Sequence, residues 1–365
     1  MKIVYDHQIF SRQKYGGISR YFFEISNRIP AIDGDSVEIF SPFYVNHYGD
    51  RSSHGFRAFK FPGSSMVLGA ANTVAGKLSV RWQNDIAIFH ETYYSRFGYA
   101  PAKAKRIITV YDMIHELFPE SFSKADMTRH IKRRAILRAD HVICISESTR
   151  NDLVRLTDIP VEKTSVVHLG HSLTEAHVSP PPVPYSQRPY LLYVGNRGGY
   201  KNFNSLMLAV GNSKILRNEF SVICFGGGEF TRDELSEMRR HDLNLDDIKH
   251  VEGDDAVLAG LYSSAIALVY PSLYEGFGIP PLEAMAYGCP VICTDTSSLP
   301  EVVGEAAELF DPRDTDCLRA SIERVASSQE VRKGLIARGY ERIMGFSWDR
   351  CARATLAQYK RVLES

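Results

Sequence analysis

Short apolar segments rich in β-branched residues alternate with longer helical stretches along the chain. Uninterrupted apolar segments of this kind are typical of parallel strands that are buried on both faces. Their alternation with helices predicts an α/β fold made of doubly wound parallel sheets. The expected strands are KIVY (2–5), VEIF (37–40), IAIF (86–89), RIITVYD (106–112), HVICIS (141–146), SVVHLG (165–170), YLLYVG (190–195), FSVICFGG (220–227), IKHVEG (248–253), AIALVYPS (265–272) and PVICTD (290–295).

A proline-rich stretch, SPPPVPYSQRP (179–189), divides the chain into two halves. Its five prolines in eleven residues exclude a helix or a central strand, so we expect a stiff connector. The length of 365 residues also exceeds what one hydrophobic core usually serves. We therefore expect two Rossmann-like domains, residues 1–178 and 190–346, facing each other across a cleft. Ligands of such sheets bind at the carboxyl ends of the strands.

Composition and charge narrow the range of possible functions. Lysine plus arginine equals aspartate plus glutamate at 43 each, so no nucleic-acid partner is expected, because nucleic-acid-binding domains usually carry a basic excess. No apolar run approaches the ~18 residues that span a bilayer. Asp6 interrupts the N-terminal segment before it reaches the length of a signal peptide, and the expected location is therefore cytoplasmic. The CxxxC pair Cys289 and Cys293 lacks a second pair or nearby histidines, so no metal site is expected.

The segment YEGFGIPPLEAMAYG (274–288) follows an expected strand and therefore lies at the edge where ligands bind. Pro280 and Pro281 suit the first turn of a helix, where a missing N–H has no cost. Gly276 and Gly278 allow the backbone to approach a ligand closely. The segment therefore predicts a ligand-binding loop that leads directly into the N-terminus of a helix.

Two glutamates belong to this segment, Glu275 on the loop and Glu283 in the expected first helical turn. Carboxylate oxygens accept hydrogen bonds from the hydroxyls of a sugar or a ribose. Either glutamate alone is explained as well by a solvated loop charge or by a favourable interaction with the helix dipole. Together, directly after a buried strand, they favour a hydroxyl-rich ligand.

Other candidate residues follow other expected strands. In KYGGISRYFFEIS, Gly16 and Gly17 open a helix whose N-terminus can meet a phosphate or an acceptor group. In YVGNRGGYKNF, Arg197 and Lys201 flank a Gly-Gly pair and suit a diphosphate, which they can bind by charge-assisted hydrogen bonds. In VYDMIHELFP, His115 lies just past a strand end, although a lone histidine is more often structural.

The E-x7-E spacing within EGFGIPPLE, followed by EAMAYGCPVICTD, closely resembles the retaining glycosyltransferases of family 4, which have the GT-B fold. The likeness extends over most of the chain. It implies that Glu275 and His115 contact the donor sugar and that Glu283 binds the nucleotide ribose. It also implies that Lys201 and Arg197 neutralise the leaving nucleotide diphosphate. The expected donor- or nucleotide-binding residues are Gly16, Gly17, Gly195, Gly226, Gly276, Phe277, Gly278 and Glu283.

The resemblance implies transfer of a sugar from a nucleotide diphosphate to an acceptor hydroxyl, with retention of configuration and without a metal or a cofactor. Stretches such as GGISRY and YKNF are similar to those of bacterial surface-polysaccharide enzymes that often use GDP-mannose. GDP-mannose is therefore the expected donor, a UDP-sugar is the alternative, and a glycan or lipid-linked glycan is the expected acceptor. The resemblance also implies that the amphipathic C-terminal helix, residues 347–365, crosses back to the first domain.

Two features depart from the family pattern. Arg197 and Lys201 lie closer together than in the common R-x5-K form. VVHLGHSL (166–173) stands where many members carry P-N-G-[IV]-D, so Gly170 is kept while the asparagine and aspartate are absent. The contacts of this second loop with a ligand are therefore not predicted.

Three other functions fit parts of the pattern. A glycoside hydrolase would place two carboxyl groups beside the scissile bond, but it has no use for basic phosphate-binding loops. A nucleotide-sugar epimerase would need further acid–base groups that the sequence does not assign. A catalytically silent nucleotide-sugar-binding scaffold would be expected to lose Glu275, Lys201 or His115, and all three are present.

A basic helix is expected within residues 128–141. Its cations suggest a peripheral contact with an anionic membrane, although most charged helix faces are simply solvated. The basic residues are Arg129, Lys132, Arg133, Arg134 and Arg138.

Overall fold

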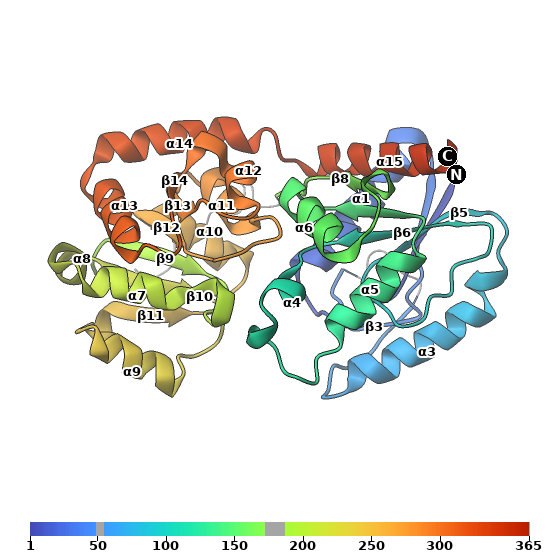
Figure 1. Ribbon diagram of the computed structural model, residues 1–365, viewed down its shortest axis with the longest axis horizontal. Helices are drawn as coiled ribbons and strands as arrows, with labels where there is room; N and C mark the ends of the chain where they lie inside the picture. The colour runs from blue at the N-terminus through green and yellow to red at the C-terminus, as the bar shows by residue number, and fades with distance from the viewer. Residues whose placement is uncertain (49–54, 172–186, 365) are drawn as a thin grey trace. The chain divides into compact units, whose positions relative to one another are not determined.

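The computed structural model describes residues 1–48, 55–171 and 187–364, and it divides the chain into two compact units (Figure 1). The first unit comprises Met1–Gly170 and Ser347–Ser365, and the second comprises His171–Phe346. Most of the predicted proline-rich connector, 179–189, lies outside the described residues. Each unit is built on a parallel sheet, so the predicted α/β class is confirmed.

The first unit contains a six-stranded parallel sheet with the order β2-β1-β5-β6-β7-β8. Ile3 pairs with Val37 on one side and with Ile88 on the other. A separate pair of short parallel strands, β3 (Phe43–Tyr44) and β4 (Phe56–Arg57), was not predicted, because two residues carry no periodic signal. The strands of the main sheet are β1 (Lys2–Tyr5), β2 (Ser36–Ile39), β5 (Ile86–Glu91), β6 (Lys105–Val110), β7 (His141–Cys144) and β8 (Thr164–Val166).

The C-terminal helix, α15, belongs to the first unit and packs along α1. Its buried face includes Trp348, Cys351, Leu356 and Tyr359, as the amphipathic pattern predicted. The Tyr359 hydroxyl lies 2.6 Å from Nδ1 of His90 beneath the helix. The helices of this unit are α1 (Gly17–Asp33), α3 (Ser64–Leu78), α4 (Ile114–Leu117), α5 (Thr128–Arg138), α6 (Glu147–Thr157) and α15 (Trp348–Glu364), with 3-10 turns η1 (Val80–Trp82), η2 (Pro119–Ser121) and η3 (Val161–Lys163).

The second unit contains another six-stranded parallel sheet, with the order β11-β10-β9-β12-β13-β14. In chain order this is the 3-2-1-4-5-6 arrangement of dinucleotide-binding folds. Only β14 was missed by the apolar pattern, because its three residues, ELF, are too short to stand out. The strands are β9 (Tyr190–Val194), β10 (Ser221–Phe225), β11 (Ile248–Val251), β12 (Ala267–Tyr270), β13 (Val291–Thr294) and β14 (Glu308–Phe310).

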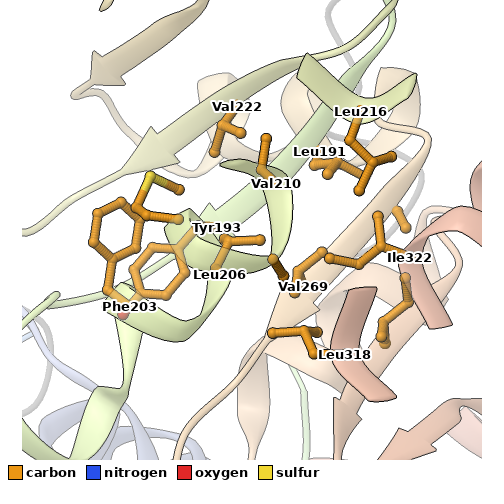
Figure 2. Packing of buried hydrophobic residues seen from close by; sticks show 14 of the residues in the cluster. Leu191, Tyr193, Phe203, Leu206, Val210, Leu216, Val222, Val269, Leu318 and Ile322 are labelled. Carbon is orange, nitrogen blue, oxygen red and sulfur yellow. The ribbon is translucent and has the colours of Figure 1, made fainter. Parts of the chain in front are cut away.

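The core of the second unit forms where α7 and α13 pack on the sheet (Figure 2). Phe203 and Leu206 of α7 contact the sheet beside Tyr193, and Leu318 and Ile322 of α13 belong to the same cluster, on the side of Val269. The helices are α7 (Phe203–Gly211), α8 (Lys214–Glu219), α9 (Arg232–Arg240), α10 (Asp255–Ser264), α11 (Ile279–Ala286), α12 (Leu299–Val303), α13 (Thr315–Ser327) and α14 (Gln329–Ile343), with 3-10 turns η5 (Gly199–Lys201), η6 (Leu245–Asp247) and η7 (Gly304–Ala306).

The direction of chain winding reverses between β9 and β12, which are neighbours in the second sheet. The loops that follow these two strands therefore leave the sheet at one point, where open α/β sheets bind their ligands. The loops contact each other directly, because the Leu273 N–H donates to the Tyr200 carbonyl at 2.7 Å. The Asn202 side-chain amide also donates to the Pro271 carbonyl at 3.1 Å. This junction is where most of the candidate site residues lie.

Candidate active site

Lys201 and Glu275 meet at the junction of the two loops. Lys201 ends the turn η5 after β9, and Glu275 lies on the loop after β12. The Lys201 ammonium donates to Oε1 of Glu275 at 2.6 Å, and both side chains are largely buried. Two residues 74 positions apart in the sequence are thus brought into contact at the switch point of the sheet.

Two tyrosines surround this ion pair. The Lys201 ammonium lies 5.3 Å from the ring centroid of Tyr200 and 5.6 Å from that of Tyr270, within the range of cation–π attraction. Burial, and then the charge of Glu275 and a hydrogen bond to it, raise the pKa of Tyr270 well above its ordinary value. The Tyr270 hydroxyl therefore stays protonated and serves Glu275 as a neutral donor. Sequence reasoning missed both tyrosines, although Tyr270 ends the strand that leads into the glycine-rich loop.

The loop that carries Glu275 is held by serines of the next loop. The Glu275 N–H donates to the Ser297 hydroxyl at 2.9 Å. The Ser298 hydroxyl donates to the carbonyls of Glu275 at 2.8 Å and of Phe277 at 2.7 Å. These bonds fix the backbone around Glu275 before any ligand arrives. No sequence motif indicated the two serines, because their partners are main-chain atoms more than twenty positions away.

Arg197, which was predicted to bind a diphosphate, is hydrogen-bonded to protein acceptors in the structure. Its guanidinium is buried and donates to the Gly226, Gly228 and Glu229 carbonyls at 3.1, 2.7 and 2.9 Å. Its Nε donates to Oε1 of Glu234 at 2.7 Å. The prediction treated Arg197 as a charge facing the ligand, but the neighbouring loop presents a ring of carbonyl acceptors that satisfies the guanidinium within the protein. Arg197 thus fastens the glycine-rich loop after β10 to the loop after β9.

Three of the predicted glycines adopt backbone conformations that side chains disfavour. Gly195, Gly226 and Gly278 have φ values of +122°, +79° and +114°. At Gly227 a Cβ atom would also come within 2.8 Å of the Gly195 carbonyl oxygen. The glycines therefore permit the close packing of these loops, and the structure gives them this local reason whether or not a ligand binds.

Gly276 and Phe277 follow Glu275 on the loop, where both are buried. The Phe277 ring packs edge-on against Phe346 with 5.8 Å between ring centroids. Its side chain is thus engaged in packing, and only its backbone belongs to the loop surface proposed to meet a donor.

Glu283 is the fifth residue of α11, which begins at Ile279 with Pro280 and Pro281 in its first turn. The prolines are where they were predicted, but Glu283 is not in the first turn, because the helix begins one residue before the proline pair. Its buried carboxylate accepts a hydrogen bond from the Tyr262 hydroxyl at 3.4 Å. Burial, followed by the Glu283 charge, raises the pKa of Tyr262 well above its ordinary value.

The remaining predicted residues belong to the first unit. Gly16 and Gly17 follow the sheet strand β1, and α1 begins at Gly17 without a side-chain cap, which leaves its first N–H groups available. His115 lies in α4, after β6, and stacks on Phe122 with 4.0 Å between ring centroids. Its Nε2 is 3.6 Å from Oδ2 of Asp126.

A fully buried lysine supports the turn that carries His115. Lys132 of α5 donates to the Asp112 carbonyl at 2.9 Å and to Oε2 of Glu116 at 2.7 Å. Asp112 precedes α4 and Glu116 lies within it, so the lysine ties this turn to α5. The sequence grouped Lys132 with the basic surface of its helix, whereas the structure turns it inward.

Comparison with solved structures defines the class of fold. A sucrose-phosphate synthase from Thermosynechococcus elongatus superposes with a TM-score of 0.73 at 20% identity, covering 100% of this chain and 99% of that one. Anabaena HepE in complex with UDP and glucose gives 0.71 at 15% identity, covering 99% and 100%. The glycosyltransferase WaaG, involved in lipopolysaccharide biosynthesis, gives 0.70 at 14% identity, covering 97% and 98%. The fold is therefore that of the GT-B glycosyltransferases, as predicted.

Sequence comparison defines the family. Residues 141–342 match the family described as glycosyl transferases group 1, and residues 15–175 match glycosyltransferase family 4. The chain belongs to the group 1 glycosyl transferases. It is 29% identical over 280 residues to O-antigen chain mannosyltransferase B of Escherichia coli, covering 73% of this chain and 74% of that protein. It is also 29% identical over 229 residues to O-antigen chain mannosyltransferase RfbU of Salmonella typhimurium, covering 62% of each.

Proposed function

We propose that this protein is a retaining glycosyltransferase that moves a sugar from a nucleoside diphosphate donor to a hydroxyl of a glycan or lipid-linked acceptor during synthesis of a surface polysaccharide. The observation that carries the proposal is the Lys201–Glu275 pair at the switch point of the second sheet. An ammonium group can stabilise negative charge that develops on a departing diphosphate. A carboxylate can accept hydrogen bonds from sugar hydroxyls.

In the proposed reaction, the bond between the anomeric carbon and the diphosphate oxygen breaks, and the acceptor oxygen bonds to the same face of that carbon. The acceptor proton passes to the leaving phosphate, so the products are a glycoside and a free nucleoside diphosphate. Lys201 stabilises the charge on that phosphate, while Glu275 positions the sugar. A contact of His115 with the donor sugar is assigned on the resemblance alone.

The diphosphate is assigned to Lys201 because the neighbouring alternative is acidic. A pocket of about 610 Å³ lies between the loops after β9 and β10 and the start of α9. Its lining includes Asp233, Glu234 and Glu237, whose carboxylates repel phosphate oxygens. The only cation in that lining, Arg197, is held by protein acceptors.

GDP-mannose is the donor that we favour, and its binding and transfer need no metal or cofactor in this scheme. Support comes from two relatives that are named O-antigen chain mannosyltransferases. A UDP-sugar is the alternative, favoured by the similarity of fold to HepE, which was solved with UDP and glucose.

Calorimetric titration with GDP, UDP, ADP and dTDP tests the donor class, using the wild-type protein and the variants Lys201→Ala and Glu283→Ala. Exposed residues of the same unit provide matched controls, Lys214→Ala and Glu330→Ala. Selective binding of one nucleotide, weakened by the two site variants and not by the controls, supports the proposal. The absence of measurable binding to all four nucleotides contradicts the proposal.

Transfer itself is tested with the sugar nucleotide that binds. The anomeric configuration of the product, read by NMR before it can equilibrate, distinguishes retention from inversion. Tight nucleotide binding with no transfer to any glycan or lipid-linked acceptor would favour the silent scaffold instead.

A further inference from the structure

Tyr15, His47 and Arg57 of the first unit form a stack of side chains. The rings of Tyr15 and His47 are nearly parallel, with 4.1 Å between their centroids and 5° between their planes. Nη2 of Arg57 lies 2.8 Å from Nδ1 and 3.0 Å from Nε2 of His47. A group in the plane of the imidazole could not lie this close to both nitrogens, so the guanidinium lies against the ring face that Tyr15 does not cover. The imidazole is thus held between an aromatic ring and a permanent cation.

The main chain brings these three residues together from separate segments. Tyr15 belongs to the loop after β1, His47 follows β3, and Arg57 ends β4. The His47 N–H donates to the Lys14 carbonyl at 3.1 Å, which joins the first two segments directly beside the stack. The third segment is joined to the second because β3 and β4 pair in parallel. Backbone hydrogen bonds therefore fix where the three side chains meet.

The stack lies where the loop after β1 leads into α1. Tyr15 directly precedes Gly16 and Gly17, and α1 begins at Gly17 without a side-chain cap. The loop follows a strand of the parallel sheet, and open α/β sheets bind their ligands at the carboxyl ends of the strands. Tyr15 is 64% exposed, and Arg57 is exposed as well. A ligand at the start of α1 can therefore reach both side chains.

The charge of the segments that build the stack is positive. Residues 7–23 and 55–84 contain no aspartate or glutamate. Arg12, Lys14 and Lys60 are exposed cations that lie within three positions of Tyr15 or Arg57 in the sequence. The whole chain has 43 basic and 43 acidic residues, so this excess is local. A local excess of one charge favours a ligand of the opposite charge, which here is an anion.

We propose that Tyr15, His47 and Arg57 recognise a carboxylate or phosphate group on the acceptor glycan. The inference rests on the proposed sugar transfer, in which the donor diphosphate is assigned to Lys201 of the second unit. The Arg57 guanidinium binds the anionic group through charge-assisted hydrogen bonds, in the forked geometry that suits both carboxylates and phosphates. The Tyr15 ring packs against the apolar face of a sugar ring, as aromatic side chains do in ligand sites. His47 positions the other two side chains relative to each other.

An acidic glycan fits this stack better than a neutral one. A neutral sugar presents hydroxyls, which carboxylates bind as readily as cations do. The segments 7–23 and 55–84 supply cations and aromatic rings but no carboxylate side chain. The stack is therefore suited to an anionic group attached to a ring, and an acidic sugar combines these two features.

Two matched pairs of saccharides test the role of charge. Tetragalacturonate and its fully methyl-esterified form differ in their carboxylate charges, and mannose 6-phosphate and mannose differ in the phosphate. Affinities are measured by ligand-observed NMR titration, which extends to weak binding. We expect the wild-type protein to bind one acidic saccharide about tenfold or more tightly than its neutral counterpart, and the pair that shows this preference identifies the anionic group. The preference should decrease as salt is added, because the charges are exposed.

Substitutions in the stack separate the contribution of charge from that of the aromatic ring. Arg57→Gln should lower the affinity for the acidic saccharide about tenfold and leave the affinity for the neutral one unchanged. Tyr15→Ala should weaken the binding of both saccharides by a similar factor, because it removes packing and no charge. Matched controls in the same unit are Arg81→Gln and Phe97→Ala, which replace exposed residues on other elements. Neither control should change the binding of the saccharides.

Equal affinity for the acidic and neutral members of both pairs, no measurable binding of either acidic saccharide, or equal losses in Arg57→Gln and Arg81→Gln would overturn the inference. Calorimetric titration of the same variants with nucleoside diphosphates separates this result from the proposed function. A protein that binds a nucleotide without preferring an acidic saccharide retains the proposed function and loses the anionic acceptor. A protein that prefers the acidic saccharide but binds no nucleotide retains the anion site and loses the proposed sugar transfer.

Discussion

The ammonium group of Lys201 lies 2.6 Å from the Glu275 carboxylate, so the two charges neutralise each other where the donor is proposed to bind. A nucleoside diphosphate would compete with Glu275 for the same ammonium. Binding would therefore exchange an internal ion pair for one between Lys201 and phosphate. The carboxylate released in this exchange becomes available to the sugar hydroxyls.

Replacing Glu275 by glutamine should separate nucleotide binding from transfer. The neutral amide no longer competes for Lys201, so nucleoside diphosphate affinity should stay the same or increase. Transfer should fall by roughly 100-fold or more, because the sugar loses a charged acceptor that acts in the transition state. Titration calorimetry and initial rates measure the two effects.

The companion variant, Lys201→Ala, should weaken both binding and transfer. Exposed Glu330→Gln serves as the control for the loss of a carboxylate. If Glu275→Gln and Lys201→Ala lower nucleotide affinity equally, the proposal that the diphosphate competes with Glu275 for Lys201 is wrong.

Arg197 should matter more for the folded state than for phosphate binding. Its guanidinium is buried against the Glu234 carboxylate and three carbonyls, so Arg197→Ala leaves these acceptors without their donor. We expect a loss of about 3 kcal/mol in the free energy of unfolding, measured with urea. Arg197→Ala/Glu234→Ala should lose less than the sum of the two single variants. Strict additivity would show that the pair is not coupled.

The sequence predicted the sheets more completely than the side-chain roles. All eleven apolar segments contain strands, because burial on both faces leaves a signal within each segment. Side-chain roles that depend on partners far along the chain could not be predicted from the sequence. The hydrogen bonds of Arg197 to the Gly226 and Gly228 carbonyls, for example, could not be predicted from its own loop. Lys132 looked exposed until Glu116 was placed beside it.

The backbone contact of Gly170 is another feature that could not be predicted from the sequence. The motif suggested that it preserves a turn. In the structure a Cβ atom at Gly170 would lie 2.4 Å from the Trp348 nitrogen and 2.6 Å from the Ser347 carbonyl carbon. The glycine is therefore required where the chain re-enters the first unit at α15, a contact between distant segments that no local pattern contains.

The Lys132–Glu116 pair should position His115 in the proposed reaction. Lys132→Met leaves Glu116 without its cation and should cost about 3–5 kcal/mol of unfolding free energy. Lys132→Met/Glu116→Leu removes both charges and should recover most of that stability. If the pair positions His115, the double variant should still have a reduced kcat with a nearly unchanged KM. Recovery of both stability and kcat would make the role purely structural.

Asp6 should make stability fall as the pH rises from about 4 to about 7. Burial, and then the charge of Glu91, raise the pKa of Asp6 to about 7, although Thr92 and Gln8 donate hydrogen bonds to it. Between the ordinary pKa of 3.8 and this value, the unfolded chain has lost a proton that the native protein keeps. The native state therefore binds more protons, and stability declines by up to about 4 kcal/mol across this interval.

Buried histidines act in the opposite direction and must be separated from this effect. Burial lowers the pKa of His7 and His90 to about 3, so their contribution to stability increases with pH up to the ordinary value of 6.5. Asp6→Asn removes only the carboxyl contribution. The free energy of unfolding in urea is measured for wild type and for Asp6→Asn from pH 4 to pH 7.5, in steps of about half a pH unit. The difference between the two proteins at each pH isolates the contribution of the Asp6 carboxyl group. The variant should gain stability relative to wild type as the pH rises, and a constant difference across the range would show that Asp6 ionises normally in the folded protein.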